Sequence, residues 1–424
     1  GLTVVGANAT PTYSGVAQTN SVATVTGIQG SSDSFTITGY GTGTNAGTYN
    51  DNLVATATGT TQAANYNITY TNGSLAIGKA TLTVTADNKT KVYGDTNPSF
   101  TATITGYVNG EGSSAISGAP AMSTTATQYS NVASYAITPV VGTLAANNYD
   151  FSYTNGALAI TAAPLTITGA NANPTYSGVA QTNSVATVTG IKGSTDSFTI
   201  TGYGTGTNAG TYNDTLVATA AGATRAANYD ITISNGALTI GKANATVTAN
   251  SANPTYTGQA QSVTGFTASG LVNNETAAVL TGVTASGATG TNAGTYTNTV
   301  TGTDSNYNLT LVNGALTIAK ANATVTANSA NVTYNGNDQS VAGFTASGLV
   351  NSETAAVLTG VTASGATGKN YGTYTNTVSG TDGNYNLTLV DGTLSVAKAG
   401  LTVVGANATP TYSGVAQTNS VATV

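Results

Sequence analysis

Hydrophobic and polar residues alternate along this chain with a period of two. In TLTVTA, residues 81–86, Leu82, Val84 and Ala86 fall on one side of an extended chain, and three threonines fall on the other. Such alternation predicts β-strands with one buried and one solvated face. Helical periodicity is confined to NNETAAVLTG (273–282) and NSETAAVLTG (351–360), where Asn or Ser could cap a helix of one or two turns. The pattern therefore predicts an all-β protein.

Two tyrosine markers recur in step, with a period of about 80 residues. The first marker is the tyrosine of PTYSG-like sequences, found at Tyr13, Tyr93, Tyr176, Tyr256, Tyr334 and Tyr412. The second is the tyrosine of an Asn-Tyr pair, found at Tyr66, Tyr149, Tyr229, Tyr307 and Tyr385. Together they predict five β repeats and the start of a sixth, with boundaries at 1–79, 80–162, 163–242, 243–320, 321–398 and 399–424. Residues 400–424 repeat residues 1–25 without a change.

A period this long fits a small self-contained β domain and is too long for one coil of a solenoid. An immunoglobulin-like sandwich is favoured over a β-grasp-like sheet with a short helix, because most repeats lack any helical signal. Only about three residues, such as Gly78, Lys79 and Ala80, separate the last strand of one repeat from the first strand of the next. Linkers this short predict a stiff rod, about 200 Å long if each repeat spans roughly 35–40 Å.

The end of each repeat carries a second recognisable pattern. In YNLTLVNGALTI, residues 307–318, two alternating stretches flank Asn313-Gly314, the residue pair favoured in a type I′ turn with two positive φ angles. The same position is filled by Asn72-Gly73, Asn155-Gly156, Asn235-Gly236 and Asp391-Gly392 in the other repeats. We therefore expect a two-residue β-hairpin to close every repeat.

Composition narrows the classes of partner. Only 6% of the residues are charged, and nine Lys and Arg with a net charge of −6 provide no basic surface for nucleic acid or anionic membranes. No apolar stretch of about 18 residues is present, so no membrane insertion is expected within these residues. The absence of Cys excludes disulfides and thiolate chemistry.

Catalytic chemistry has few candidates. Without His or Cys, acid-base work would depend on fifteen carboxylates scattered singly, of which the closest pairs are Asp87 with Asp95 and Asp382 with Asp391. No D-x-D-x-D-G calcium loop and no phosphate-binding glycine loop occurs. The sequence thus predicts a protein that is not an enzyme, with no catalytic residue, cofactor site or metal site.

Two recurring residue types have both a structural and a functional interpretation. Lysines recur at the ends of repeats, at Lys79, Lys242, Lys320 and Lys398. They could form isopeptide crosslinks, but a solvated lysine or a junction hydrogen bond is favoured, because no acid recurs beside them at fixed spacing. The repeated tyrosines could stack on sugars, but burial in the core is favoured, because they fall on inward-facing strand positions.

Repeat 2 carries the most recognisable sequence. KVYGDTNPSFTATITGYVNGEG (91–112), SNVASYAI (130–137) and NNYDFSYTNGALAI (147–160) resemble the MBG domain of the YGX type, which occurs in tandem in large bacterial surface proteins of the filamentous-haemagglutinin and adhesin kind. Repeats 1 and 3, with PTYSGVAQT and GTNAGTY, resemble the related YDG type, and repeats 4 and 5 resemble more divergent relatives. This resemblance implies an extracellular, surface-attached stalk or fibre and brings no catalytic residues.

The strands are rich in Thr, Val and Tyr and have almost no charge, so they lack the residues that usually protect sheet edges from pairing. Other copies of the same chain are therefore the expected partners, and surface glycans are a second candidate. Two functions follow. Either the repeats form or bundle into an extracellular filament for attachment or matrix cohesion, or they are a passive stalk that presents a ligand-binding adhesin domain elsewhere in the protein.

Overall fold

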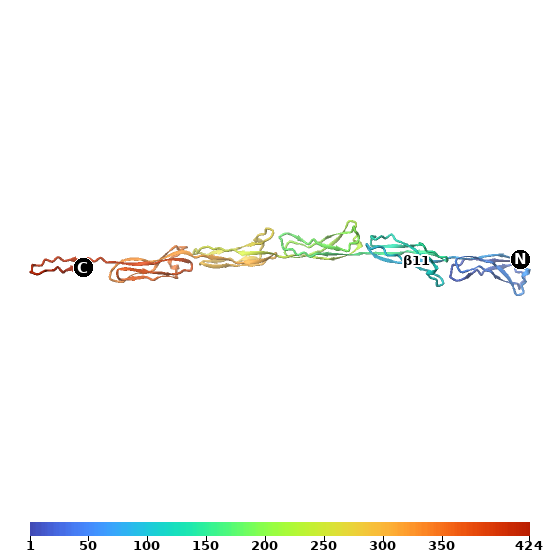
Figure 1. Ribbon diagram of the computed structural model, residues 1–424, viewed down its shortest axis with the longest axis horizontal. Helices are drawn as coiled ribbons and strands as arrows, with labels where there is room; N and C mark the ends of the chain where they lie inside the picture. Colours follow the sequence, from blue (N-terminus) through green and yellow to red (C-terminus); the bar gives the residue numbers. More distant parts are fainter. The chain divides into compact units, whose positions relative to one another are not determined.

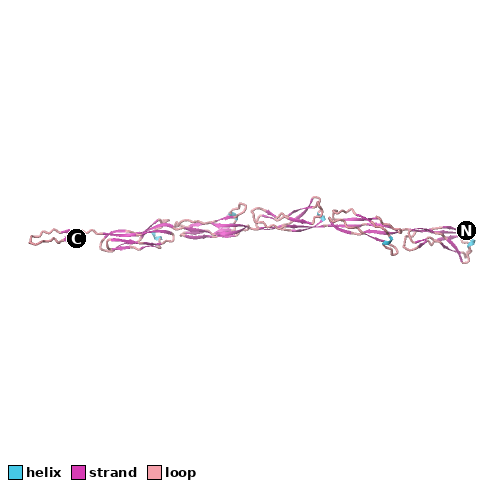
Figure 2. Ribbon diagram, in the orientation of Figure 1, coloured by secondary structure: helices cyan, strands magenta, loops and turns pink.

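The computed structural model describes residues 1–424, and strands run through every repeat (Figure 1, Figure 2). No α-helix is present. The helical elements are single 3₁₀ turns, namely η1 (Ala63–Asn65), η2 (Ser113–Ala115), η3 (Ala226–Asn228), η4 (Ala277–Val279) and η5 (Ala355–Val357). The two helices expected at 273–282 and 351–360 are thus reduced to η4 and η5. Their N-cap residues are Thr276 and Thr354, without a side-chain cap, so the expected Asn or Ser cap is wrong.

The first strand of each repeat is the centre of a three-stranded sheet. These opening strands are β1 (Leu2–Gly6), β11 (Ala80–Ala86, labelled in Figure 1), β18 (Ala163–Gly169), β27 (Ala243–Ala249) and β36 (Ala321–Ala327). Their antiparallel neighbours are β4 (Ala23–Thr26), β13 (Ala102–Thr105), β20 (Ala186–Thr189), β29 (Phe266–Ser269) and β39 (Phe344–Ser347). Their parallel neighbours are β9 (Ile68–Thr71), β16 (Tyr149–Thr154), β25 (Tyr229–Ser234), β34 (Tyr307–Val312) and β44 (Tyr385–Val390). In β11 the predicted alternation is confirmed, because Leu82, Val84 and Ala86 are buried.

The last strand of each repeat belongs to a second sheet. These closing strands are β10 (Ser74–Ile77), β17 (Gly156–Thr161), β26 (Ala237–Ile240), β35 (Gly314–Ile318) and β45 (Gly392–Ala397). They pair with β7 (Gly47–Asn50), β15 (Ser134–Val140), β23 (Gly210–Asn213), β32 (Gly294–Asn298) and β42 (Gly372–Asn376). Three closing strands also pair in parallel with β2 (Asn8–Ala9), β12 (Lys89–Val92) and β37 (Ala330–Thr333).

Shorter antiparallel pairs complete the repeats. One set comprises β5 (Ser34–Thr38) with β8 (Val54–Thr58), β21 (Ser197–Thr201) with β24 (Val217–Ala221), β30 (Val283–Ala285) with β33 (Val300–Gly302), and β40 (Val361–Ala363) with β43 (Val378–Gly380). The other comprises β3 (Gln18–Thr19) with β6 (Thr42–Gly43), β19 (Gln181–Thr182) with β22 (Thr205–Gly206), β28 (Gln261–Val263) with β31 (Ala288–Gly290), and β38 (Gln339–Val341) with β41 (Ala366–Gly368). In repeat 2, β14 (Ala121–Ser123) pairs with β15, and near the end of the chain β46 (Val404–Gly405) pairs with β47 (Ala422–Thr423).

Two layers of strands face each other inside a repeat. In repeat 1, Leu2 and Val4 of β1 form one hydrophobic cluster with Phe35 and Ile37 of β5 and Ala55 of β8. A core held between two sheets is the arrangement of a sandwich. The predicted all-β tandem array is therefore confirmed.

The hairpin predicted at the end of every repeat is wrong. In repeat 4, β34 pairs with β27 and β35 pairs with β32, so the chain crosses from one sheet to the other at Asn313-Gly314. Neither residue has a positive φ. Gly314 is needed for a different reason, because a Cβ there would lie 2.4 Å from the carbonyl oxygen of Ala249. The alternating pattern correctly indicated the two strands, but not which strand each of them pairs with.

The hydrophobic clusters do not follow the sequence repeats. Tyr256, Leu316 and Ile318 of repeat 4 belong to the same cluster as Val325 and Tyr385 of repeat 5. By contacts the chain divides into two compact units, residues 1–171, 183–204 and 213–237, and residues 172–182, 205–212 and 238–424. The division passes through repeat 3, so each of the four junctions between complete repeats lies within one unit. Buried side chains of two consecutive repeats therefore pack together at each junction.

The inter-repeat junction as the candidate functional site

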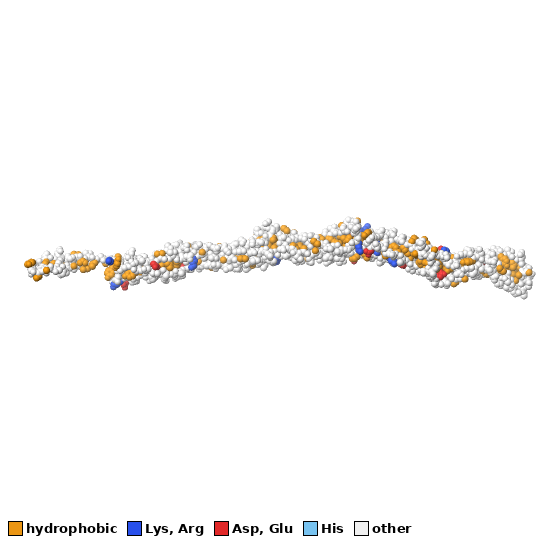
Figure 3. Space-filling model, in the orientation of Figure 1, with side chains coloured by type: hydrophobic (Ala, Val, Ile, Leu, Met, Phe, Trp, Pro, Cys, Tyr) orange, Lys and Arg blue, Asp and Glu red, His pale blue; other side chains and the backbone are white.

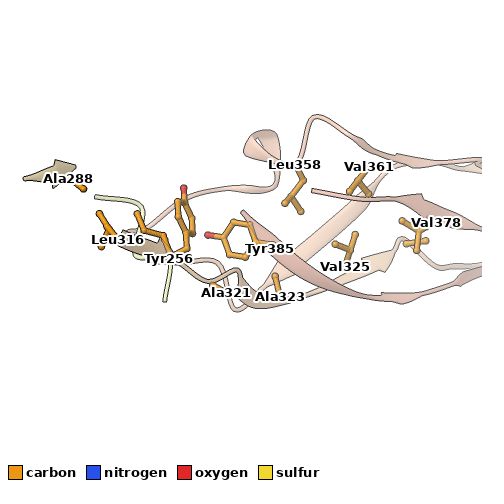
Figure 4. Close-up of a cluster of buried hydrophobic side chains, with 12 residues drawn as sticks. Tyr256, Ala288, Leu316, Ala321, Ala323, Val325, Leu358, Val361, Val378 and Tyr385 are labelled. Carbon is orange, nitrogen blue, oxygen red and sulfur yellow. The ribbon is translucent and has the colours of Figure 1, made fainter. Parts of the chain in front are cut away.

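At each junction a tyrosine of one repeat packs against a tyrosine of the next. We call the first-marker residues Tyr13, Tyr93, Tyr176 and Tyr256 the docking tyrosines, and the second-marker residues Tyr149, Tyr229, Tyr307 and Tyr385 the socket tyrosines. Figure 4 shows Tyr256 beside Tyr385, with Leu316 of repeat 4 nearby. Their ring centroids are 5.4 Å apart with an interplanar angle of 82°, an edge-to-face contact favoured by the quadrupoles of the rings. The other three pairs have the same centroid distance.

A carboxylate of the second repeat binds both hydroxyl groups. The Tyr256 hydroxyl donates to Oε1 of Glu353 at 2.6 Å, and the Tyr385 hydroxyl donates to Oε2 of the same residue at 2.5 Å. The bridging carboxylates at the other junctions are Glu111, Asp196 and Glu275. Since hydrogen bonds to an ionised acceptor are stronger than neutral ones, the carboxylate fastens the docking tyrosine to its socket.

A type I′ turn aims the carboxylate in the repeats that use Glu. Before Glu353, Asn351 and Ser352 have φ angles of 50° and 60°, and the Glu353 N–H donates to the Val350 carbonyl at 3.0 Å. Two consecutive positive φ angles define this turn type. The Asn351 side chain donates to the carbonyl of Gly258 in the preceding repeat at 3.2 Å. The turn thus places two groups on the junction at once.

An asparagine pair crosses each junction beside the tyrosines. The Asn228 side chain accepts from the Val132 N–H at 3.0 Å and donates to Oδ1 of Asn131 at 3.0 Å, and both partners belong to repeat 2. The same two bonds are made by Asn148, Asn306 and Asn384. These are the asparagines that precede the socket tyrosines, so the Asn-Tyr marker identifies the receiving end of a repeat.

The recurring lysines also meet the next repeat. The ammonium groups of Lys242 and Lys320 donate to the carbonyls of Asp304 and Asp382, each at 2.6 Å, and Lys79 donates to the Ala146 carbonyl at 3.2 Å. The favoured interpretation of a junction hydrogen bond is therefore confirmed for these three. Lys398 instead lies over the ring of Tyr371, 5.0 Å from its centroid.

The junction changes the acidity of its groups. The hydrogen bond to Glu353, reinforced by burial, raises the pKa of Tyr256 to about 12, and Glu275 acts in the same way on the pKa of Tyr176, also about 12. Burial, followed by the bond to Asp196, raises the pKa of Tyr93 to about 12. The bonds from Tyr13 and Tyr149 lower the pKa of Glu111. The phenols of these docking tyrosines therefore stay neutral well above neutral pH.

The carboxylates that are close in the sequence have separate structural roles. Asp87 accepts from the hydroxyls of Thr101 and Thr103. Asp95 of repeat 2 pairs with Lys192 of repeat 3 at 3.2 Å, across the junction of these repeats. Asp382 accepts from two backbone N–H groups just after it, and Asp391 accepts from the Val378 N–H. Three of these carboxylates thus accept hydrogen bonds within their own repeat, and Asp95 forms an ion pair.

Sequence reasoning placed the tyrosines correctly only in part. The docking tyrosines are 5% to 6% exposed, as predicted for core residues. Tyr334 and Tyr412, which share the marker, are 41% and 92% exposed. The bridging carboxylates were missed, although an acid precedes the second-marker tyrosine by 32 to 38 residues in every complete repeat. That recurring order and similar spacing is the signal that could have identified them.

Known proteins place this architecture in a family. The family model described as MBG domain (YGX type) matches residues 82–159, 245–317 and 323–395, more than half of the chain. A solved structure of Sidekick-1 immunoglobulin domains 1–5 is 11% identical, with 93% of this chain and 98% of that chain covered and a TM-score of 0.18. No curated protein matches the chain. The three matched segments fall in repeats 2, 4 and 5, and the chain belongs to the MBG domain family of the YGX type.

Proposed function

We propose that this chain is a structural segment of an exported bacterial surface protein, in which consecutive MBG repeats are locked together and carry load in an extracellular filament. The observation that carries the proposal is the junction itself. The same tyrosine pair, bridging carboxylate and asparagine pair recur at all four junctions between complete repeats. A site that recurs once per repeat and binds the next repeat has a role in holding the array together.

The local geometry suits a chain that carries tension and resists bending. The closing strand β35 and the opening strand β36 are separated by Ala319 and Lys320 alone, so a pull along the chain passes from one sheet directly into the next. Beside this covalent link, the docking and socket tyrosines with their bridging carboxylate, and the asparagine pair, resist bending at the junction. A cluster of buried side chains from both repeats excludes water there, which strengthens these polar contacts.

The surface agrees with a role outside the cell. Backbone and side chains that are neither hydrophobic nor charged cover most of the face seen in Figure 3, and charged side chains are few on it. Large bacterial surface proteins carry MBG domains in tandem, which supports an extracellular, cell-attached location. No helix of the chain is both long and apolar enough to cross a membrane.

A passive stalk is the second candidate, and the short linkers favour it equally. The two functions differ in one property, because a filament subunit binds other copies and a stalk does not. Electron microscopy and solution scattering on residues 1–398, over a series of concentrations, test this. Filaments or a mass that rises with concentration support the first function, and isolated chains at every concentration support the stalk.

The junction itself is tested by single-molecule stretching of the same chain. Replacing the four docking tyrosines with alanine should lower the unfolding forces and increase the flexibility of the chain. Replacing the exposed Tyr334 in the same way is the matched control and should change neither. Equal behaviour of the wild type and the docking variant would contradict a load-bearing role of the junctions.

A further inference from the structure

Every complete repeat leaves the same strand edge unpaired. The strands β9, β16, β25, β34 and β44 each pair with one neighbour only, the opening strand of their repeat. In β16, β25, β34 and β44 the last three residues are all exposed, whichever face of the sheet they belong to. A strand of six residues with a free edge is a template for pairing with another strand.

Among the six-residue edges, those of repeats 4 and 5 are the least protected. Both have the sequence YNLTLV, without a charge, a proline or a bulge. Leu311 and Val312 are 37% and 42% exposed, and their counterparts Leu389 and Val390 are similarly exposed. By contrast, β16 and β25 carry the exposed Asp150 and Asp230 near their beginnings. Since inward or edge charges oppose intermolecular pairing, β34 and β44 are the favoured edges.

We propose that β34 and β44 pair antiparallel with the same edges of a second copy of this chain. This inference rests on the proposed filament function and names its lateral contact. The two strands are identical and occur at equivalent positions in consecutive repeats, so two copies offer self-complementary edges that a symmetric pair can use.

The side-chain pattern selects the register. In an antiparallel sheet, residues directly opposite each other point to the same side. A register centred on Thr310 places Leu309 opposite Leu311 of the second copy, and Asn308 opposite Val312. Apolar residues then face each other on the inner side of the joined sheet, where Leu309 is already half-buried. The exposed Thr310 lies at the symmetry centre, opposite its own equivalent.

Lysine at the centre of this register tests the pairing. The full 424-residue chain with Thr310→Lys and Thr388→Lys places like charges opposite each other between the two copies. In sedimentation equilibrium we expect the mass of the wild type to rise with concentration, and the dissociation constant of this variant to be at least tenfold higher. Both threonines are exposed, so the thermal unfolding of the variant should match that of the wild type.

The matched control places the same charges on the opposite edge of the same sheets. Thr267 on β29 and Thr345 on β39 are also exposed, and Thr267→Lys with Thr345→Lys should associate like the wild type. Equal weakening by both variants would mean a general effect of charge and would overturn the assignment to β34 and β44. A wild type that remains a single chain at every concentration would overturn lateral pairing, while the stretching result on the junctions would still stand.

A position-specific crosslink gives a second readout. The chain has no cysteine, so Thr310→Cys introduces a single thiol. The symmetric register brings two such residues directly opposite each other, within the Cα separation that a disulfide accepts. Mild oxidation should convert Thr310→Cys to a dimer on a non-reducing gel and leave Thr345→Cys as a single chain. Dimers from Thr345→Cys alone would place the contact on the other edge.

Discussion

Repeats 1 and 3 have nearly the same sequence, yet their receiving ends are buried to different degrees. In repeat 3, Tyr229 and Asn228 are 6% and 3% exposed, whereas in repeat 1 Tyr66 is half-buried and Asn65 is exposed. The internal geometry of the two ends is the same, because each tyrosine hydroxyl donates to its Asp at 2.5 Å. Docking of repeat 2 onto repeat 3 therefore covers a socket that the repeat has already formed.

The opposite end of a repeat shows the same contrast. Tyr256 of repeat 4 is 6% exposed because repeat 5 receives it, and Tyr334 at the equivalent position of repeat 5 is 41% exposed. A preformed socket and a rigid aromatic side chain lose little conformational freedom when they meet. The comparison teaches that burial of these residues is a property of the junction and not of the single repeat, which mutations at matched positions can test.

The largest expected effect comes from Tyr256→Ala. This change removes a buried ring from a cluster shared by repeats 4 and 5, and deletion of a buried aromatic side chain typically costs about 3–5 kcal/mol. Tyr334→Ala removes an exposed ring and should cost about 0.5 kcal/mol or less. Hydrogen exchange around Val350, whose N–H donates to Tyr385, reports the loss locally. Equal exchange in the two variants would mean that the junction adds no stability.

Asn228→Ala should have an intermediate effect. It leaves the Val132 N–H and the Asn131 side chain without their partners at a covered junction, which costs roughly 1–3 kcal/mol. Asn65→Ala removes an exposed side chain of the matching residue in repeat 1 and should be close to neutral. Thermal unfolding of both variants, followed by circular dichroism, measures the difference. A loss of the same size at Asn65 would show that this asparagine stabilises its own repeat instead.

The strands of this fold could be predicted from the sequence, because alternation depends only on which residues face the core. Leu82 and Val84 are buried as their spacing requires. Strand partners could not be predicted in the same way. The Asn313-Gly314 pair fits a hairpin locally, but long-range pairing with β27 and β32 sends the chain across to the other sheet. The pairing of β34 and β35 in two different sheets therefore outweighed the local turn propensity of Asn-Gly.

The junction was harder to predict because its residues come from two repeats. Tyr256 and Glu353 are 97 residues apart, a separation longer than one repeat, so a search within single repeats does not connect them. The turn that aims the carboxylate uses Asn351 and Ser352 with positive φ, and Ser is an unusual residue for this conformation. In the sequence, the bridging carboxylate is indicated only by its similar distance from the second-marker tyrosine in every repeat.

High pH should destabilise the junctions, because the buried docking tyrosines ionise there. The pKa of Tyr93, Tyr176 and Tyr256 is about 12 in the folded chain and near 10 when unfolded. A raised pKa in the folded state gives stability that is complete below pH 10 and is lost as the pH rises towards 12. Absorbance of ionised tyrosine should show a late-titrating group. Glu353→Gln should move the Tyr256 pKa down towards 10, and an unchanged titration would exclude the bridging carboxylate as the cause.

The smallest effect is expected from Lys320→Ala. The ammonium group of Lys320 donates to the Asp382 carbonyl across the junction, but the contact is exposed, so its loss should cost no more than about 0.5 kcal/mol. Lys398→Ala, where the lysine lies over the ring of Tyr371 in its own repeat, is the control and should also be nearly silent. The intact mass of the wild type adds a sharper test, because an isopeptide bond between a junction lysine and an asparagine would lower it by one ammonia. A full mass, together with a small effect of Lys320→Ala, would leave the buried tyrosines and asparagines as the groups that hold consecutive repeats together.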